Sequence, residues 1–287
     1  MRLTDLAGTI GVEVHGLDLS AGNGTDPTSS ADDIRSLRAA LDTRHLLLRR
    51  GEVLPGMVQT AFAARFGPLV PERSVWGYVS NTHPEGVVRE GPLLFHSDFA
   101  FTDHPVWFLS LHAIEVPADG SPTIWADAMA AVDLLPRELR ARLESLQVLN
   151  CFDLLVDGDR RMRVADIDPR SPRTVHPVIA PHPRLGRPVV MANAMHTDSI
   201  LGLPEPESEA LLADLFAVLY DESNRYEHRW TVGDLIVWDN IALQHARGDI
   251  TTEEPRTLQR VTVGEYTPTE SIPGLAELLA EKHGTTR

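Results

Sequence analysis

Short hydrophobic stretches separated by turn residues recur along this chain, and they limit its possible folds more than any other feature. Residues 106–116 and 257–267 alternate apolar and polar side chains, a pattern typical of strands with one buried face. Residues 46–48 and 234–238 are continuous apolar runs of strand length. Many short strands with few helices between them predict a mainly β protein with helical insertions, built on a β-sandwich or barrel.

Helices are predicted where apolar residues recur at helical spacing. Ser30 and Asp33 resemble a capping box, in which each side chain binds the backbone N–H group of the other residue. The predicted helical segments are residues 30–41, residues 55–66, residues 207–220, and one that is capped by Asp127, passes Pro136 and ends near residue 146.

Length and composition indicate an ordinary globular protein, and we expect residues 1–287 to form one domain. The net charge of −15 argues against a nucleic-acid partner, because phosphate binding needs a basic face. The sequence has no apolar run of membrane-spanning length and no signal-peptide pattern at its start, so we expect no membrane association. Cys151 is the only cysteine and can form no internal disulfide, which suits a cytoplasmic location. The expected partner is a small-molecule substrate, and a homo-oligomer stays open.

One short motif offers ligands for a metal ion. His96 and Asp98 are two residues apart, and in a β-strand this spacing would put an imidazole and a carboxylate on the same face. His245, far away in the sequence, would supply a second imidazole. Two histidines and one carboxylate on one side of an octahedral ion leave the other side open, as expected for a non-haem Fe(II) oxygenase.

Two arginines follow the second histidine of this set. Arg256 and Arg260 lie in the expected strand 257–267 or beside it, four residues apart, so both should share one face with Leu258 between them. A guanidinium there could bind the far end of a dicarboxylate that chelates the metal. The alternative from the residues alone is that both arginines form surface ion pairs with Glu253 or Glu254.

Together these motifs resemble the TauD/TfdA family of Fe(II)- and 2-oxoglutarate-dependent oxygenases. The resemblance spans nearly the whole chain and keeps the family's motif order. The matching segments are His96-Ser97-Asp98, residues 120–125, His176-Pro177-Val178, residues 182–190, Gly202-Leu203-Pro204 with the helix that follows, His228-Arg229-Trp230, Gly233-Asp234-Leu235, Trp238-Asp239-Asn240, His245-Ala246, and the pair Arg256 and Arg260.

The resemblance implies a double-stranded β-helix, or jelly roll, with helical insertions. It also implies Fe(II), with 2-oxoglutarate and O2 as co-substrates, and Thr123 and Arg256 as the residues that bind the distal carboxylate of 2-oxoglutarate. The implied iron ligands, which are also the implied catalytic residues, are His96, Asp98 and His245. The implied reaction hydroxylates an unactivated C–H bond of a small organic molecule and releases succinate and CO2.

The substrate is less well defined by the sequence. Arg260 would face the site and could bind either the near carboxylate of 2-oxoglutarate or an anionic group on the substrate. His196 lies in a segment that could approach the site. Pro92 and its apolar neighbours stand near a position where taurine dioxygenases carry an asparagine, so taurine is not expected as substrate. Trp76 and Tyr78 are further candidate substrate-binding residues. Residues 71–92 and 151–173 lack periodicity and are candidate lid loops.

Two other functional classes fit the same three ligands. A hydrolase could use them to hold Zn²⁺ and activate water. A non-catalytic sensor on the same barrel could bind a metal and a ligand without turnover. Because Asp98 is present, halogenation is not expected: related halogenases lack this carboxylate so that a halide can bind.

Overall fold

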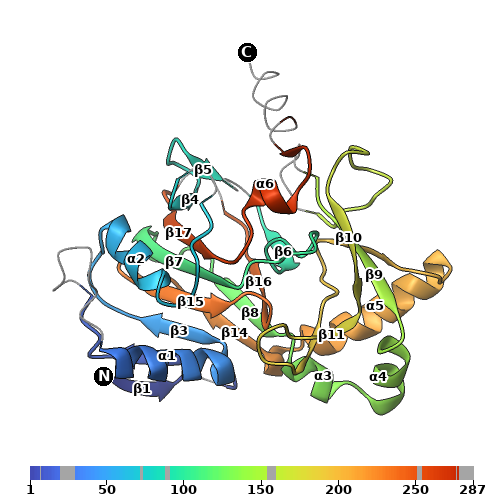
Figure 1. The fold of residues 1–287 in the computed structure, drawn as a ribbon, viewed down its shortest axis with the longest axis horizontal. Helices are drawn as coiled ribbons and strands as arrows, with labels where there is room; N and C mark the ends of the chain where they lie inside the picture. The colour runs from blue at the N-terminus through green and yellow to red at the C-terminus, as the bar shows by residue number, and fades with distance from the viewer. Residues whose placement is uncertain are drawn as a thin grey trace.

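Two facing β-sheets form the centre of the protein, shown in Figure 1 by a computed structural model that describes residues 1–6, 8–19, 30–71, 74–87, 91–153, 160–250, 254–275 and 277. In order across the larger sheet, its strands are β1 (Arg2–Asp5), β2 (Val12–His15), β3 (Leu46–Arg49), β15 (Leu235–Asp239), β7 (Phe108–Glu115), β17 (Thr257–Val263), β4 (Gly77–Ser80) and β5 (Gly86–Val87). Across the smaller sheet they are β14 (Arg225–His228), β8 (Thr123–Asp127), β16 (Leu243–Arg247) and β6 (Leu93–His96).

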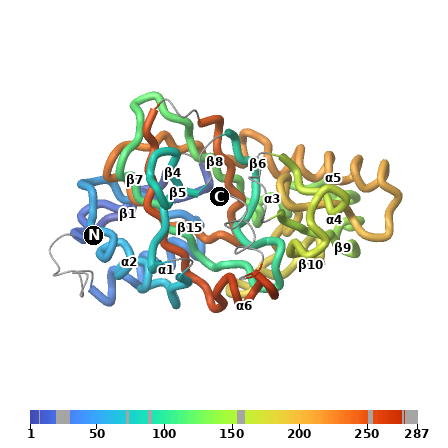
Figure 2. The backbone as a smooth tube through the Cα atoms, turned by 90° about the horizontal axis from the view of Figure 1, so that it is seen from above, coloured from blue at the N-terminus to red at the C-terminus, as the bar shows by residue number. Residues whose placement is uncertain are grey.

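The helices and two minor sheets lie around this centre. The minor sheets are β10 (Arg173–Pro177), β9 (Gln147–Cys151) and β13 (Thr197–Ile200), and the pair β11 (Ile179–Pro181) and β12 (Pro188–Val190). The helices are α1 (Ala31–Arg44), α2 (Gly56–Ala63), α3 (Ala130–Leu134), α4 (Arg137–Leu143), α5 (Glu205–Leu219) and α6 (Pro268–Ser271), with a 3-10 turn at Glu222–Asn224. Figure 2 shows α1 and α2 towards one end of the long axis and α4, α5, β9 and β10 towards the other.

Apolar side chains from both large sheets fill the space between them. Leu48 and Leu109 from the larger sheet and Leu243 from the smaller one belong to the same buried cluster. Trp125 on β8 and Trp238 on β15 meet edge to face across the gap, with their ring centroids 5.5 Å apart. This packing holds the strands that carry the candidate ligands against the rigid larger sheet.

The outer face of the larger sheet is covered by α1 and α2. Leu47 belongs to the buried apolar cluster between this face and the two helices. Its neighbours on β3, Leu46 and Leu48, point between the sheets, as strand alternation requires. The capping box expected at the start of α1 is present, with the Ser30 side chain accepting from the backbone of Asp33 and the Asp33 carboxylate accepting from that of Ser30.

Two details of the predicted secondary structure are wrong. The helix expected to pass Pro136 is instead two short helices, α3 and α4, because proline has no N–H group to donate within a helix and disfavours the helical conformation of the residue before it. In the candidate lid 71–92, residues 77–80 form β4, which pairs with β17. Residues 72–73, 88–90 and 154–159 of the two candidate lids lie outside the described residues.

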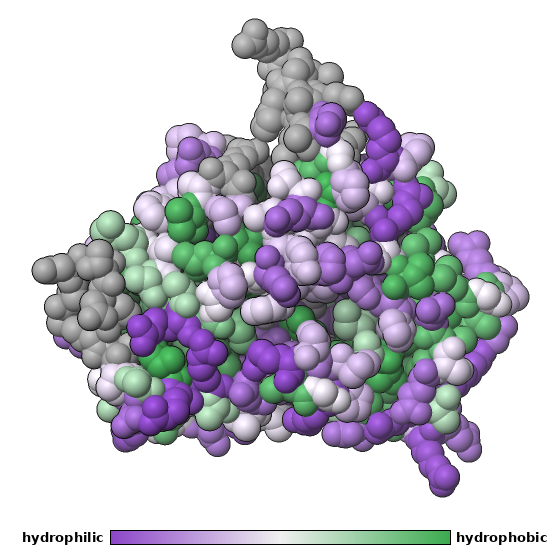
Figure 3. Space-filling model, in the orientation of Figure 1, coloured by the Kyte–Doolittle hydropathy of each residue, from purple (hydrophilic) through white to green (hydrophobic). Residues whose placement is uncertain are grey.

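The mainly β architecture with helical insertions agrees with the prediction from the sequence. Among the described residues, every helix is too short or too polar to cross a membrane. The face shown in Figure 3 intersperses polar and apolar residues.

The core between the sheets should dominate stability. Leu48 is 0% exposed, so Leu48→Ala should lower the free energy of unfolding by about 2–5 kcal/mol through lost burial and a residual cavity. Leu201→Ala is the control, since Leu201 is 37% exposed and its truncation should change stability by less than about 0.5 kcal/mol. Denaturant unfolding midpoints measure both, and equal midpoints would contradict the assignment of this core.

Candidate active site

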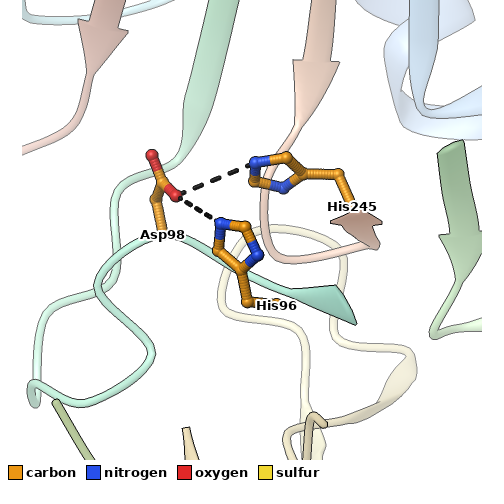
Figure 4. A group of neighbouring side chains, drawn as sticks. All are labelled: His96, Asp98 and His245. Atoms are coloured by element: carbon orange, nitrogen blue, oxygen red, sulfur yellow. Dashed lines mark ion pairs between the residues drawn. The ribbon is translucent and has the colours of Figure 1, made fainter. Parts of the chain in front are cut away.

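Three side chains converge where the smaller sheet faces the larger one. His96 ends β6, and His245 lies opposite it on the adjacent strand β16. A single oxygen of Asp98, Oδ1, lies 3.2 Å from His96 Nε2 and 3.8 Å from His245 Nε2, and Figure 4 shows all three groups pointing toward one another. One ligand atom from each residue lies within 4.8 Å of the others, a spacing that a single metal ion could bridge.

Asp98 reaches this cluster by a different route from the one expected. It lies just after β6, in a turn closed by a hydrogen bond from the Ala100 N–H group to the Ser97 carbonyl, so strand alternation does not aim its side chain. Asn240 fixes the turn: its Oδ1 accepts from the Asp98 N–H group at 2.9 Å, and its Nδ2 donates to the Asp98 carbonyl at 2.9 Å. Phe99 then takes a left-handed conformation with φ of 62°, which is uncommon for a residue with a side chain.

The donor set suits a divalent cation. His96 Nδ1 lies 2.8 Å from the Leu94 carbonyl, which can only accept, so Nδ1 donates to it and Nε2, which faces Asp98, is the nitrogen left to coordinate a metal. This nitrogen and the carboxylate oxygen 3.2 Å away attract each other only when a proton or a metal ion lies between them. Two imidazoles and one carboxylate are also the ligands expected for a mononuclear iron site with open positions.

The ionisation of these groups favours metal binding. Burial, and then the nearby His96, lower the pKa of His245 to about 3, which keeps its imidazole neutral. Burial by itself would raise the pKa of Asp98, but the contacts with the His96 and His245 imidazoles and with the Arg260 guanidinium outweigh it and hold that pKa below its ordinary value. A neutral imidazole and an ionised carboxylate are the forms that bind metals.

A small cavity of about 80 Å³ extends from this cluster into the space between the sheets. Thr123, Arg256 and Arg260 all line it together with the three candidate ligands. Its apolar lining residues are Val79, Leu93, Leu111, Trp238 and Leu258. The structure therefore brings the three candidate metal ligands and two arginines to one cavity.

Thr123 and Arg256 are both deeply buried at this cavity. Thr123, on β8, is 3% exposed, and its Oγ1 accepts a hydrogen bond from Trp230 Nε1 at 2.9 Å. Arg256 is also 3% exposed; it immediately precedes β17, and its backbone N–H group donates to the Asn81 side chain at 2.8 Å. Burial, and then the neighbouring charge of Arg247, lower the pKa of Arg256 to about 9. A guanidinium this desolvated favours an anion beside it.

Arg260 lies nearer to the metal-binding end. Its Nη1 is 3.5 Å from Asp98 Oδ2, the carboxylate oxygen that does not face the two histidines. Arg260 therefore contacts a candidate ligand directly, in addition to lining the cavity.

His196 packs against His96 from the side of β13. Its ring meets His96 edge to face, at 5.6 Å between centroids, and meets Phe101 and Phe152 in the same way at 5.0 and 5.4 Å. The side chain is buried, and its Nδ1 has no hydrogen-bond partner among the described residues. Burial, followed by the neighbouring His96, lowers its pKa well below the usual value, so the ring is neutral.

The structure does not bring Trp76 and Tyr78 to the cluster. Tyr78 alternates with Val79, which lines the cavity, so the tyrosine points to the opposite face of the larger sheet. Its ring stacks on His83. Trp76 packs against the apolar core beneath α1 and α2, and it donates a hydrogen bond to the Tyr78 hydroxyl at 3.2 Å.

One cavity residue, Arg247, was not predicted from the sequence. Its side chain lines the cavity and is 5% exposed, although most arginines lie on the surface. The available signal was its spacing: Arg247 follows His245 by two residues on one strand, so both side chains share a face.

A larger cavity of about 300 Å³ lies elsewhere, beside Trp107, His182 and Arg184. Its buried carboxylate, Asp239, contacts His182 at 3.2 Å, contacts Arg184, and accepts two backbone N–H bonds from the turn that follows it. These contacts satisfy the carboxylate, and they brace the turn that presents Asn240 to Asp98.

A site of two histidines and one carboxylate between the sheets of a jelly roll defines a class, the non-haem iron oxygenases. The chain belongs to one family of that class, described as the taurine catabolism dioxygenase TauD, TfdA family, whose model matches residues 2–262. It is therefore a dioxygenase that depends on Fe(II) and 2-oxoglutarate and consumes O2. The predicted family, jelly-roll fold and co-substrates are confirmed, and the hydrolase and sensor alternatives are set aside.

Named relatives and a solved structure agree with this membership. The chain is 31% identical to the alpha-ketoglutarate-dependent 2,4-dichlorophenoxyacetate dioxygenase of Cupriavidus pinatubonensis, over 80% of this chain and 88% of the relative. It is 30% identical to the pentalenolactone F synthase of Streptomyces arenae, over 91% and 94%. The structure of AAD-2 in complex with Mn(II) and N-oxalylglycine superposes with a TM-score of 0.76 at 26% identity, covering 93% of this chain and 98% of that one.

The Asn240 bridge should govern metal affinity. Asn240→Ala removes the hydrogen bonds that fix the Asp98 turn, so Mn(II) or Fe(II) should bind about 10- to 100-fold more weakly. Asn224→Ala is the matched control, because Asn224 is equally buried but bonds to the Asp127 and Leu219 carbonyls, away from the cluster. Anaerobic metal titration compares the variants, and equal affinities would refute the role of the bridge.

Proposed function

We propose that this enzyme hydroxylates an unactivated C–H bond of a small organic molecule, with release of succinate and CO2. The proposed iron ligands are His96, Asp98 and His245. Arg256 and Thr123 are the proposed anchors for the distal carboxylate of 2-oxoglutarate. The observation that supports this most directly is the cavity that connects the metal-binding atoms to the buried Arg256 guanidinium.

The bound iron would supply O2 activation coupled to the oxidative decarboxylation of 2-oxoglutarate. The chain's own residues would position the co-substrate and keep water away from it. Apolar side chains such as Leu111, Leu258 and Trp238 exclude water from the cavity, which strengthens the attraction between a carboxylate and Arg256. Thr123 Oγ1 already accepts from Trp230, so its own proton is free to be donated to a carboxylate oxygen.

Arg260 would have two tasks. Its contact with Asp98 Oδ2 would hold the carboxylate so that Oδ1 stays aimed at the metal. Its position at the cavity would also let it attract an anionic group on the substrate, in a protein whose net charge of −15 otherwise repels anions.

The substrate proposed here has an apolar or aromatic body and an acidic group. The His196 ring packs edge to face against His96, Phe101 and Phe152 pack against His196 in turn, and the neutral His196 can form one further hydrogen bond. The relative with 31% identity is named for 2,4-dichlorophenoxyacetate, an aromatic ring that carries a carboxylate. Taurine has no apolar body of this kind, and Pro92 cannot replace the amide of an asparagine.

Loss of the Arg256 charge should weaken the binding of 2-oxoglutarate. Arg256→Gln should reduce the affinity for 2-oxoglutarate about 10- to 100-fold, since a charge-assisted hydrogen bond contributes about 1.5–3 kcal/mol. The visible absorption band of the anaerobic Fe(II) complex with 2-oxoglutarate measures this affinity. The control is Arg187→Gln, at an exposed arginine between β11 and β12. Absence of the band in the iron-loaded wild type would remove 2-oxoglutarate from this site.

The proposed substrate class predicts which compounds should stimulate turnover most. In a panel that includes aryl-substituted carboxylates and taurine, the aryl acids should stimulate O2 consumption and succinate release more strongly. For the best of them, His196→Phe should raise the substrate KM several-fold, and more than the KM for 2-oxoglutarate, because it keeps an aromatic ring but removes both ring nitrogens, including the unpartnered Nδ1. Stimulation by taurine alone would overturn this proposal.

A further inference from the structure

The strand β16 brings a second arginine to the cavity beside the proposed 2-oxoglutarate anchors. Its pairing with β8 is regular, with His245 opposite Trp125 and Arg247 opposite Thr123. Side chains two residues apart on a strand share a face, and both His245 and Arg247 line the cavity. One strand therefore carries a candidate iron ligand and, one pleat further on, a guanidinium.

The spacing along β16 fits the co-substrate. Two residues of an antiparallel strand cover about 7 Å, which is comparable with the length of a five-carbon dicarboxylate. If one end of that molecule chelates the metal at His245, its other end comes level with Arg247 and with Thr123 across the ladder. The position proposed for the distal carboxylate is therefore reached from two strands of the smaller sheet.

Charge and burial point to the same end of the cavity. Arg247 and Arg256 are 5% and 3% exposed and line the same space. Both guanidiniums are therefore largely removed from water, and a buried cation favours an anion beside it. Two buried cations that repel each other gain more from a shared anion than either would alone.

We infer that Arg247 is a second guanidinium for the distal carboxylate of 2-oxoglutarate, which it shares with Arg256. This rests on the proposed function of the site. The pair makes the enzyme selective for 2-oxo acids that carry a second carboxylate, more strongly than one arginine could. Arg247 is thus a residue that determines co-substrate specificity.

Arg247 has a structural contact that a test must separate from this role. Its Nη2 donates to the Gly91 carbonyl at 2.6 Å, just before the strand that ends in His96. Loss of that bond could disturb the metal cluster itself and weaken every chelating ligand equally. Loss of a carboxylate contact would weaken only ligands that have the second carboxylate.

The experiment compares two ligands on the metal-loaded protein: 2-oxoglutarate, and 2-oxopentanoate, which has the same chain length but no second carboxylate. Anaerobic calorimetric titration of the Mn(II) protein gives both affinities without turnover. For Arg247→Gln we expect the affinity for 2-oxoglutarate to fall about tenfold or more, with that for 2-oxopentanoate changed less than twofold. Equal losses for both ligands, or no loss for either, would overturn the inference.

Two further variants make the result decisive. Arg247→Lys keeps a charge but not the planar fork, so it should show the same selective loss at smaller size, and it replaces Arg247→Gln if that variant folds poorly. Arg256→Gln is run in parallel. If Arg256→Gln weakens 2-oxoglutarate more than 2-oxopentanoate and neither Arg247 variant does so, this inference is refuted and the proposed function stands. If the wild type does not prefer 2-oxoglutarate to 2-oxopentanoate, the proposed function is refuted as well.

Discussion

The pairing of β16 between β6 and β8 is the constraint on which the whole site depends. It puts His245 opposite His96 on one side and Arg247 opposite Thr123 on the other, so the metal-binding end and the cationic end are set by one backbone ladder. Backbone hydrogen bonds repeat at fixed spacing, and the distance between the two ends is therefore built into the strand. The packing of Trp125 against Trp238 then fixes this ladder relative to the larger sheet.

The cavity is lined by positive charge, whereas the protein as a whole is strongly negative. An acidic chain with a net charge of −15 buries Arg247 and Arg256 in one small cavity, where few water molecules can screen them. Close to the cavity, the potential is set by these guanidiniums rather than by distant surface carboxylates, which solvent and salt screen. The acidic surface and the binding of an acidic co-substrate are thus compatible.

The sequence predicted what local spacing and motif order determine. The separation of Arg256 and Arg260 and the alternation in residues 257–267 indicated a shared face, and both arginines line the cavity. It could not predict what tertiary contacts decide. Asp98 is aimed by a turn held by Asn240, which lies far away in the chain. The face of Tyr78 depends on the register of β4, whose four residues are too few for a periodic signal.

The left-handed turn at Phe99 links two properties that are otherwise separate. Asp98, a proposed iron ligand, directly precedes Phe99, and Phe101, whose ring packs against His196, follows it by two residues. A change of ring size at Phe99 or Phe101 would alter the turn and so shift Asp98. Phe152 also packs against His196, but from another segment and without contact to Asp98 or His96 among the ring contacts of the described residues. In a lineage that drifts toward new substrates, we therefore expect adaptation at Phe152, with the turn preserved.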